Sequence, residues 1–381
     1  MITDNASANH WLVGRAATSI LALLVLLVAS NCAVGQDAPK LQKVELPNTQ
    51  LIHMNSAIVG RPYDIQVQLP GNYSDTTRYY PVIYVLDGQW DFPLVISLYG
   101  QQYFDGFIPA SIVVGIAWGG AHPNYDSLRA GDFSPTFSKQ VPQSGNGEKF
   151  FSFITQELIP KIDSSYRTRP HDRTLMGSSF GGLFTLYAMF RQSASFNRFI
   201  LTSPYLGFDN DVIYRFEKEF AHENKGLPVR LFMAEGGLEG GQGDFDKFVE
   251  LMKSQDLKNV SLETRIVEGA GHSGAKAEGF TRGLQSVFAR PSLRLDPSHL
   301  DQYVGTYEIG PTMQIVLSRR GDQLVGTVPD GTSEVLHAET DDDFYVLGQF
   351  LNLHFKKDNS GKVTGFEMER YGGKGFIKRI K

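Results

Sequence analysis

The chain combines short apolar runs with longer amphipathic segments over most of its length. Residues 63–69 alternate strictly between apolar and polar positions, which is typical of a half-buried strand at a sheet edge. Residues 82–86 are apolar throughout and predict a buried parallel strand. Further strands are predicted at residues 51–54, 111–116, 174–176, 198–201, 229–233 and 262–267, and helices at residues 149–162, 183–191, 212–220, 245–255 and 275–288. Strands that alternate with helices indicate an α/β fold with a doubly wound, mostly parallel sheet.

The pattern changes after about residue 290. From residue 302 onward, short alternating strands are separated by turn signals, and no helical pattern is visible. The clearest of these strands are residues 313–317, 344–347 and 366–368. We therefore expect an α/β domain at 45–290, a linker around 289–292, and a small all-β domain at 296–381.

The N-terminus has the pattern of a targeting segment. Arg15 precedes an apolar run of about 14 residues, which is shorter than the roughly 20 needed to span a bilayer as a helix. Small residues at 33–35 then predict a signal peptide over residues 1–35, with an uncleaved anchor as the alternative. Lipidation at Cys32, the only cysteine, is the weaker alternative, because Asn31 stands where lipoproteins carry a small residue. We expect an exported protein, periplasmic or secreted, without an internal disulfide.

Composition narrows the range of functions. The formal charge of −5 and the pI near 6.0 give no reason to expect nucleic acid or an anionic membrane surface as a partner. The nine histidines are scattered, without His-x-x-x-His or paired-cysteine spacing, so no metal or cofactor is expected. No membrane span is expected after cleavage, and nothing in the sequence specifies an oligomeric state.

The segment Gly177-Ser178-Ser179-Phe180-Gly181 has the Gly-x-Ser-x-Gly pattern of a nucleophile elbow. A β-type run leads into it and a helical pattern leads out, which places Ser179 at the apex of a strand-to-helix turn. We expect Gly177 and Gly181 to let neighbouring backbone pass closely. The alternative is a glycine-rich turn whose serine caps the helix, and the flanking elements favour the nucleophile.

A nucleophilic serine needs a base and an acid that orients it, and in α/β-hydrolases these follow the serine in the order acid, then histidine. His272 lies in a glycine-rich loop after a predicted strand, whereas His222 ends a charged helical pattern, so His272 is the predicted base. The acid should lie in the loop after residues 229–233. Glu239 is favoured there because it lies beyond the strand end, and the other candidates are Glu235, Asp244 and Asp246.

An oxyanion hole needs two N–H donors directed at the developing negative charge. The N–H of Phe180, directly after the nucleophile, is one expected donor. The second should come from the loop after residues 82–86, where we favour Gln89 over Gly88. An ordinary Asp-Gly turn is the alternative interpretation of this loop.

With these residues identified, the chain resembles the esterase family that includes esterase D (S-formylglutathione hydrolase), the enterochelin esterases and the antigen 85 mycolyltransferases. The resemblance spans roughly residues 45–290. It rests on the elbow and on residues 84–88, 129–135, 202–204 and 271–272. It implies an α/β-hydrolase fold, and the family's Gly-x-x-acid pattern matches Glu239, although many members have aspartate there. Residues from about 296 resemble a small β-module of exported hydrolases, whose function the resemblance does not imply.

These features predict an exported serine esterase that acts on a small-molecule ester. An acyltransferase with the same triad is the nearest alternative, and a non-catalytic binding protein on a hydrolase fold is the second. The intact serine and histidine settings argue against the binding protein. Six aromatic residues are candidates for a substrate pocket, although core packing is expected for most of them: Trp90, Phe92, Tyr103, Phe104, Trp118 and Tyr205.

Overall fold

The computed structural model describes residues 43–191, 194–223, 226, 228–255, 257–310, 312–371 and 373–381. The predicted signal peptide and Cys32 lie outside the described residues. No helix among the described residues is long and apolar enough to cross a membrane.

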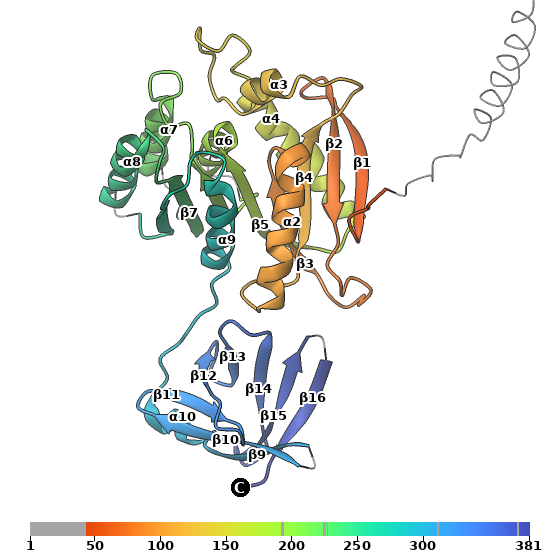
Figure 1. The fold of residues 1–381 in the computed structure, drawn as a ribbon, viewed down its shortest axis with the longest axis vertical. Helices are drawn as coiled ribbons and strands as arrows, with labels where there is room; N and C mark the ends of the chain where they lie inside the picture. The colour runs from red at the N-terminus through yellow and green to blue at the C-terminus, as the bar shows by residue number, and fades with distance from the viewer. Residues whose placement is uncertain are drawn as a thin grey trace, which may run out of the picture. The chain divides into compact units, whose positions relative to one another are not determined.

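The described part of the α/β region is built on an eight-stranded sheet with the order β1-β2-β4-β3-β5-β6-β7-β8 (Figure 1). The strands are β1 (Thr49–Ser56), β2 (Arg61–Gln68), β3 (Tyr80–Val85), β4 (Ile112–Trp118), β5 (Thr168–Ser178), β6 (Arg198–Thr202), β7 (Val229–Gly236) and β8 (Val260–Val267). β2 pairs antiparallel with both of its neighbours, and every pairing from β4 to β8 is parallel. The predicted α/β-hydrolase sheet is therefore confirmed, and its parallel strands place their carboxyl ends along one edge.

The expectation that residues 63–69 form an edge strand is wrong. β1 pairs with β2 along its whole length and takes the edge position. The alternating pattern of β2 has another cause: Tyr63, Ile65 and Val67 are fully buried in the core, while the residues between them are partly exposed. An alternating pattern indicates only that one face of a strand is more buried than the other. An inner strand such as β2 can have this pattern as well as an edge strand.

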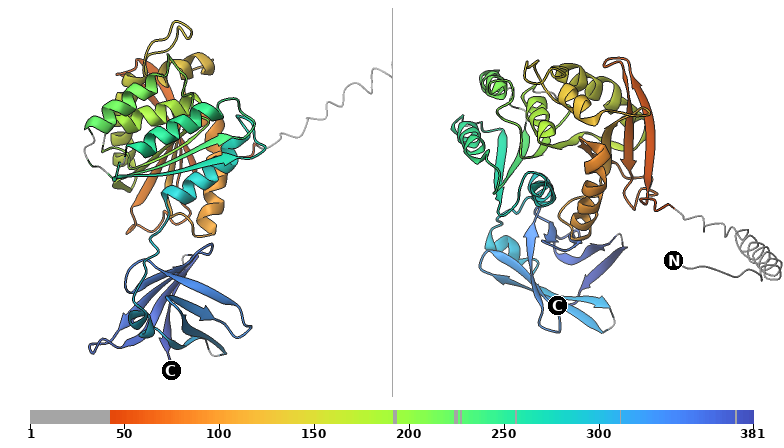
Figure 2. Two further views of the ribbon diagram at one scale, coloured as in Figure 1. Left: turned by 90° about the vertical axis from the view of Figure 1, so that its left-hand side faces the viewer. Right: turned by 45° about the horizontal axis from the view of Figure 1, so that its top comes forward.

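Helices cover both faces of the sheet (Figure 2). On one face, α2 (Gly88–Phe104) and α9 (Ala275–Val287) pack against each other and bury apolar side chains against the sheet. The other face is covered by α4 (Gly147–Phe153), a short π-helical turn η1 (Ile154–Leu158), α5 (Ile159–Ser165), α6 (Phe180–Phe190), α7 (Val212–Glu223) and α8 (Gln242–Ser254). The sheet is thus enclosed between two apolar layers, as its apolar central strands require.

Two helices of the α/β region, α2 and α3, were not predicted from the sequence. α2 begins directly after β3, so residues 88–90, expected to be a loop, form the first turn of a 17-residue helix. α3 (Tyr125–Asp132) begins where the Asn124 side chain accepts a hydrogen bond from the N–H of Ser127, a typical N-cap. Gly88 and Pro93 resemble a turn, because proline cannot donate the backbone hydrogen bond of a helix interior. Pro93 nevertheless lies inside α2, beyond its first turn.

The C-terminal region forms a closed antiparallel β-barrel in the order β10-β11-β12-β13-β14-β15-β16-β9. Its strands are β9 (Gly305–Gly310), β10 (Met313–Arg320), β11 (Gln323–Thr327), β12 (Ser333–Ala338), β13 (Asp343–Val346), β14 (Leu351–Lys357), β15 (Val363–Arg370) and β16 (Gly373–Arg379). A short helix, α10 (Pro297–Asp301), precedes them. The predicted all-β character is confirmed, and closure leaves no unpaired sheet edge.

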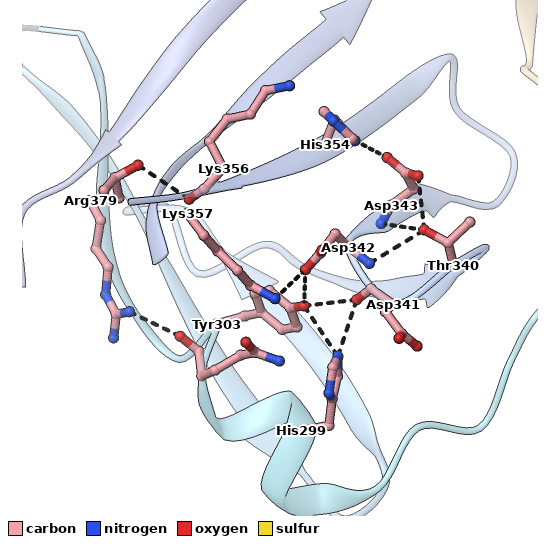
Figure 3. Close-up of polar contacts among 12 residues, drawn as sticks. His299, Tyr303, Thr340, Asp341, Asp342, Asp343, His354, Lys356, Lys357 and Arg379 are labelled. Atoms are coloured by element: carbon pink, nitrogen blue, oxygen red, sulfur yellow. Dashed lines mark hydrogen bonds and ion pairs between the residues drawn. The ribbon is translucent and has the colours of Figure 1, made fainter. Parts of the chain in front are cut away.

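The barrel has its own apolar core with a polar network beside it. Tyr303 and Tyr307 are fully buried, and the Tyr303 ring packs against Phe355 with centroids 4.3 Å apart. The Tyr303 hydroxyl donates to Oδ1 of Asp342 at 2.6 Å, and Lys357 Nζ lies 2.6 Å from the same oxygen (Figure 3). These polar groups at the edge of the core therefore have partners, as buried polar groups require.

Candidate active site

Ser179 occupies a strained turn between β5 and α6. Its backbone has φ 61° and ψ −118°, a conformation that is unfavourable for a residue with a Cβ atom. The Ser179 N–H donates to the carbonyl of Thr202 at 3.0 Å. The Ser179 carbonyl accepts from the N–H groups of Leu183 and Tyr205, at 2.9 and 3.2 Å. These bonds hold the strained residue at the carboxyl end of β5.

The glycines of the elbow differ in whether a Cβ atom would fit at their position. A Cβ atom at Gly177 would lie 2.7 Å from the carbonyl carbon of Gly181, so only glycine fits there. The same expectation for Gly181 is wrong, because a Cβ atom at that position would come no closer than 3.5 Å to the surrounding side chains, which is an ordinary contact. Gly182 has the closer approach, since its Cβ would lie 3.1 Å from Cα of Pro204.

The structure brings His272 and Glu239 together. His272 Nδ1 lies 2.5 Å from Oε2 of Glu239, although 33 residues separate them in the sequence. His272 follows β8 and Glu239 follows β7, neighbouring parallel strands whose carboxyl ends share one edge of the sheet. The described contacts include no hydrogen bond between the Ser179 hydroxyl and the His272 ring, a bond that in many hydrolases tightens only in the substrate complex.

Glu239 is held in its ionised form. Burial alone would raise the pKa of Glu239, but the hydrogen bonds that it accepts outweigh burial and lower this pKa. Its Oε1 accepts from the Ser203 hydroxyl at 2.6 Å and from the Gly236 N–H at 2.9 Å, while Oε2 faces His272. An ionised carboxylate in this position fixes the orientation of the imidazole ring and stabilises its cationic form.

The other acidic candidates do not contact His272. Asp244 is exposed and lies 3.2 Å from Lys247, and Asp246 is also exposed. Glu235 is 5% exposed at the end of β7, and no described hydrogen bond reaches its carboxylate. Burial, followed by the negative charges of Glu239 and Asp246, raises the pKa of Glu235 to about 7. The end of β7 and the loop after it thus hold two carboxyl groups: Glu239, whose pKa is lowered, and Glu235, whose pKa is raised to about 7.

The two expected oxyanion donors lie at helix N-termini. Phe180 begins α6, and Gln89 lies in the first turn of α2, where backbone N–H groups lack an acceptor within the helix. β3 and β5, which lead to these helices, are neighbouring parallel strands. A Cβ atom at Gly88 would lie 2.9 Å from the backbone of β4, so glycine is required for α2 to start this close to the sheet.

A buried ion pair holds the start of α2 from one side. Asp87 has φ 55° and a fully buried side chain, and its carboxylate receives both Nε and Nη2 of Arg129, at 2.7 and 2.9 Å. The Arg129 guanidinium also lies over the rings of Trp90 and Phe180, with 5.7 and 6.0 Å to the ring centroids. Such a bidentate pair fixes both distance and orientation, and here it joins α3 to the expected oxyanion loop.

A second ion pair joins α2 to the helix that follows His272. Lys276 Nζ lies 2.8 and 3.0 Å from the two carboxylate oxygens of Asp91. Burial raises the pKa of Asp91, and the charge of Lys276 opposes that effect. The pair connects the first turns of α2 and α9, and therefore links the helix start that carries Gln89 to the helix that follows the His272 loop.

The site is open to solvent and bordered by aromatic rings. The His272 side chain is 51% exposed, and Trp90 and Tyr205 are 46% and 44% exposed. Tyr205 packs edge-on against Phe180, next to the serine, at 5.2 Å. Of the other aromatic candidates, Phe92 and Trp118 are buried in the core, and Tyr103 and Phe104 lie in the last turn of α2, at the opposite end from Gln89.

Sequence reasoning missed five residues that contribute to this arrangement, namely Asp87, Asp91, Arg129, Ser203 and Lys276. Ser203 and Arg129 stood within the segments that carried the family resemblance, but neither was given a role. The pair of Lys276 and Asp91 had no sequence signal at all. Within the described residues, no group of three or more His, Cys, Asp or Glu side chains could hold a metal ion.

Comparisons with known proteins match two parts of the chain. Residues 56–236 match the family model described as "Putative esterase", and residues 289–376 match the "Domain of unknown function (DUF3471)". Ferri-bacillibactin esterase BesA of Bacillus subtilis (strain 168) is 30% identical over 210 residues, which cover 51% of this chain and 72% of that protein. The siderophore triacetylfusarinine C esterase of Aspergillus fumigatus is 28% identical over 48% of this chain and 64% of that protein.

Solved structures share the fold of the α/β region. The BES protein from Bacillus cereus superposes with a TM-score of 0.60 at 25% identity, covering 65% of this chain and 97% of that one. An IroE-like serine hydrolase from Shewanella oneidensis has a TM-score of 0.57 at 23% identity, covering 68% of this chain and 83% of that one.

Proposed function

We propose that this chain, which belongs to the esterase family described as "Putative esterase", is a serine esterase that cleaves a carboxylic ester through an acyl-enzyme on Ser179. The observation that carries the proposal is the contact of 2.5 Å between His272 Nδ1 and Glu239. A carboxylate that accepts the Nδ1 proton leaves Nε2 unprotonated and able to accept the proton of a serine hydroxyl.

In the proposed reaction, the Ser179 oxygen attacks the ester carbonyl while its proton moves to Nε2 of His272. The carbonyl electron pair moves onto the oxygen, where the N–H groups of Phe180 and Gln89 stabilise the charge. The C–O bond to the alcohol then breaks, and the alcohol leaves with the proton from Nε2. Water attacks the acyl-enzyme by the same route, which releases the acid and regenerates the serine.

The open setting of the histidine supports hydrolysis over acyl transfer to an alcohol. A transferase has to keep water away from its acyl-enzyme, because water is the most abundant competing nucleophile. Half of the His272 side chain is exposed to solvent, so water can reach the point of deacylation.

A siderophore ester is the proposed substrate class. Two of the relatives are named as siderophore esterases, one for triacetylfusarinine C and one for enterobactin. The open site and the exposed rings of Trp90 and Tyr205 suit an ester that is presented by a bulky ligand.

Export is proposed from the sequence pattern of residues 1–35. N-terminal sequencing of the protein from the native host should begin at Gln36. A lipid-modified N-terminus at Cys32 or an intact N-terminus would contradict this proposal.

The test of the catalytic proposal is hydrolysis of short-chain p-nitrophenyl esters by the full chain, with fluorophosphonate labelling as a second measurement. Ser179→Ala and His272→Ala should each lower kcat by about 10⁴-fold or more. Ser178→Ala and His222→Ala are the matched controls, and both should retain activity. Turnover or labelling that survives Ser179→Ala would exclude Ser179 as the nucleophile.

A further inference from the structure

The two oxygens of the Glu239 carboxylate have different partners. Oε2 faces the imidazole Nδ1 of His272 at 2.5 Å. Oε1 accepts a hydrogen bond of 2.6 Å from the Ser203 hydroxyl and one of 2.9 Å from the N–H of Gly236. Among the described residues, Ser203 is the only side chain that donates to Oε1. The carboxylate therefore cannot rotate without breaking bonds at Oε1.

The donor comes from a buried and strained position. Ser203 follows β6 directly and is 2% exposed, and its φ of 46° lies in the left-handed region. A serine in this region costs on the order of 1 kcal/mol, which glycine would avoid. The Ser203 N–H donates to the carbonyl of Ala234 at 2.7 Å, so the turn is fixed to β7, the strand that leads to Glu239.

Glycine would satisfy this backbone but could not donate a side-chain hydrogen bond. The strained serine is therefore explained by its hydroxyl rather than by the turn. A hydrogen bond from a hydroxyl to a carboxylate is among the stronger ones in proteins, and here it lies away from competing water.

We propose that Ser203 is a positioning residue of the catalytic machinery, whose hydroxyl holds Glu239 in the rotamer that directs Oε2 at His272. This inference rests on the proposed function, because it assumes that Glu239 orients the catalytic histidine. Ser203 does not touch the reacting atoms. It also helps to keep Glu239 ionised, since its hydrogen bond stabilises the charged carboxylate against the effect of burial.

The first test compares Ser203→Ala with Ser203→Gly in hydrolysis of p-nitrophenyl esters by the full chain. Both variants lose the hydroxyl, so kcat should fall about 10- to 100-fold in each, with KM nearly unchanged. Ser203→Gly also removes the backbone strain and should be the more stable of the two. If Ser203 served only the turn, Ser203→Gly would keep wild-type kcat, and the proposal would be wrong.

A double-mutant cycle separates positioning from a general structural effect. In a Glu239→Gln background the hydroxyl no longer has a carboxylate to hold, so adding Ser203→Ala should change kcat less than about twofold. Ser111→Ala is the matched control, because Ser111 is also buried and donates to a backbone carbonyl, that of Pro109, at 2.9 Å. It should leave kcat unchanged in both backgrounds. Full additivity of Ser203→Ala with Glu239→Gln would overturn the proposal.

A spectroscopic measurement keeps the two proposals distinguishable. A proton held between His272 Nδ1 and Glu239 should give a low-field ¹H resonance, which does not require turnover. This resonance should persist in Ser111→Ala and Ser179→Ala, and should weaken or vanish in Ser203→Ala and Ser203→Gly. A resonance and kcat that are unchanged in the Ser203 variants would overturn the positioning role but leave the esterase intact. Turnover that survives Ser179→Ala would overturn the proposed function, and the resonance would still test the role of Ser203.

Discussion

The carboxyl ends of the parallel strands and the edge of the barrel core both contain carboxylates in hydrogen-bonded networks, but the partners of these carboxylates differ. In the barrel, Asp342 accepts from the buried Tyr303 hydroxyl and pairs with Lys357, so its contacts are to groups of the domain itself. At the proposed catalytic site, one oxygen of Glu239 accepts hydrogen bonds from Ser203 and Gly236, while the other faces a histidine that is half exposed to solvent. The first network lies at the edge of a core, and the second leaves the His272 imidazole accessible to solvent.

The backbone shows the same difference. Asp87, Ser179 and Ser203 follow β3, β5 and β6, and all three have positive φ without being glycine. Among the described residues of the barrel strands and their turns, Tyr371 is the only such residue. Of the eight described non-glycine residues with positive φ before the barrel, Asp87, Ser179 and Ser203 follow strands that lead to the proposed site, which is a usual location of backbone strain in enzymes. Substitutions near the proposed site should therefore change kcat strongly, whereas substitutions in the barrel should lower the free energy of unfolding and leave kcat nearly unchanged.

Outside the proposed triad, the largest effect is expected for Asp87→Asn. Asparagine accepts the left-handed backbone of this position, so the substitution removes the charge that pairs with Arg129 and spares the turn. The oxyanion loop should lose its alignment and kcat should fall about 10²- to 10³-fold, as when one oxyanion donor is removed. The unpaired arginine should also lower the free energy of unfolding by about 2–3 kcal/mol.

The measurements for Asp87→Asn are ester hydrolysis and urea unfolding. Asp105→Asn is the control, because Asp105 is exposed at the opposite end of the same helix. A large loss of stability with unchanged kcat would mean that the ion pair supports the fold and not the oxyanion loop.

Features that depend on neighbouring residues could be predicted from the sequence, whereas features that depend on contacts between distant residues could not. The apolar runs of β3 and β5 and the glycines around Ser179 are local signals, and they led to the parallel sheet and to the elbow. α2 was missed because Gly88 and Pro93 resemble a turn, and because its start depends on close packing against β4. Local patterns could not reveal that packing.

The site shows the same limit. His272 and Glu239 could be predicted because each follows a predicted strand, and the carboxyl ends of parallel strands lie along one edge of the sheet. The contact of Ser203 with Glu239 joins residues 36 apart, and the pair of Lys276 with Asp91 joins residues 185 apart. Closure of the barrel depends likewise on the pairing of β9 with β16, its first and last strands. None of these contacts leaves a periodic signal in the sequence.

A smaller effect, of opposite sign, is expected for Glu235→Gln. Burial and the nearby negative charges raise the pKa of Glu235 from 4.5 to about 7 in the folded protein. Between these values the unfolded chain has released this proton and the folded protein still holds it, so stability falls as the pH rises through this window. Glutamine removes this penalty, and the variant should gain on the order of 2 kcal/mol in the free energy of unfolding at pH 8, with little gain at pH 4.5.

Urea unfolding at both pH values measures this difference. Glu250→Gln provides the control, since Glu250 is exposed on α8 and should show no pH-dependent gain. A gain of equal size at pH 4.5 and pH 8 would mean that Glu235 is destabilising for reasons of packing and not because of its charge.

The smallest effect is expected in the barrel, for Tyr303→Phe. The substitution keeps the buried ring and removes the hydroxyl, which donates to Oδ1 of Asp342 at 2.6 Å and lies 2.8 Å from the carbonyl oxygen of Asp341. Because Lys357 still pairs with Asp342, the expected loss is about 1–2 kcal/mol of unfolding free energy.

Calorimetry of the full chain should measure this loss, with Tyr79→Phe as the control, because Tyr79 is 60% exposed. The kcat for a soluble ester should stay within about twofold of the wild-type value. A larger fall in kcat would show that the barrel contributes to the reaction, and the division between a reactive sheet edge and a stabilising barrel would then be wrong.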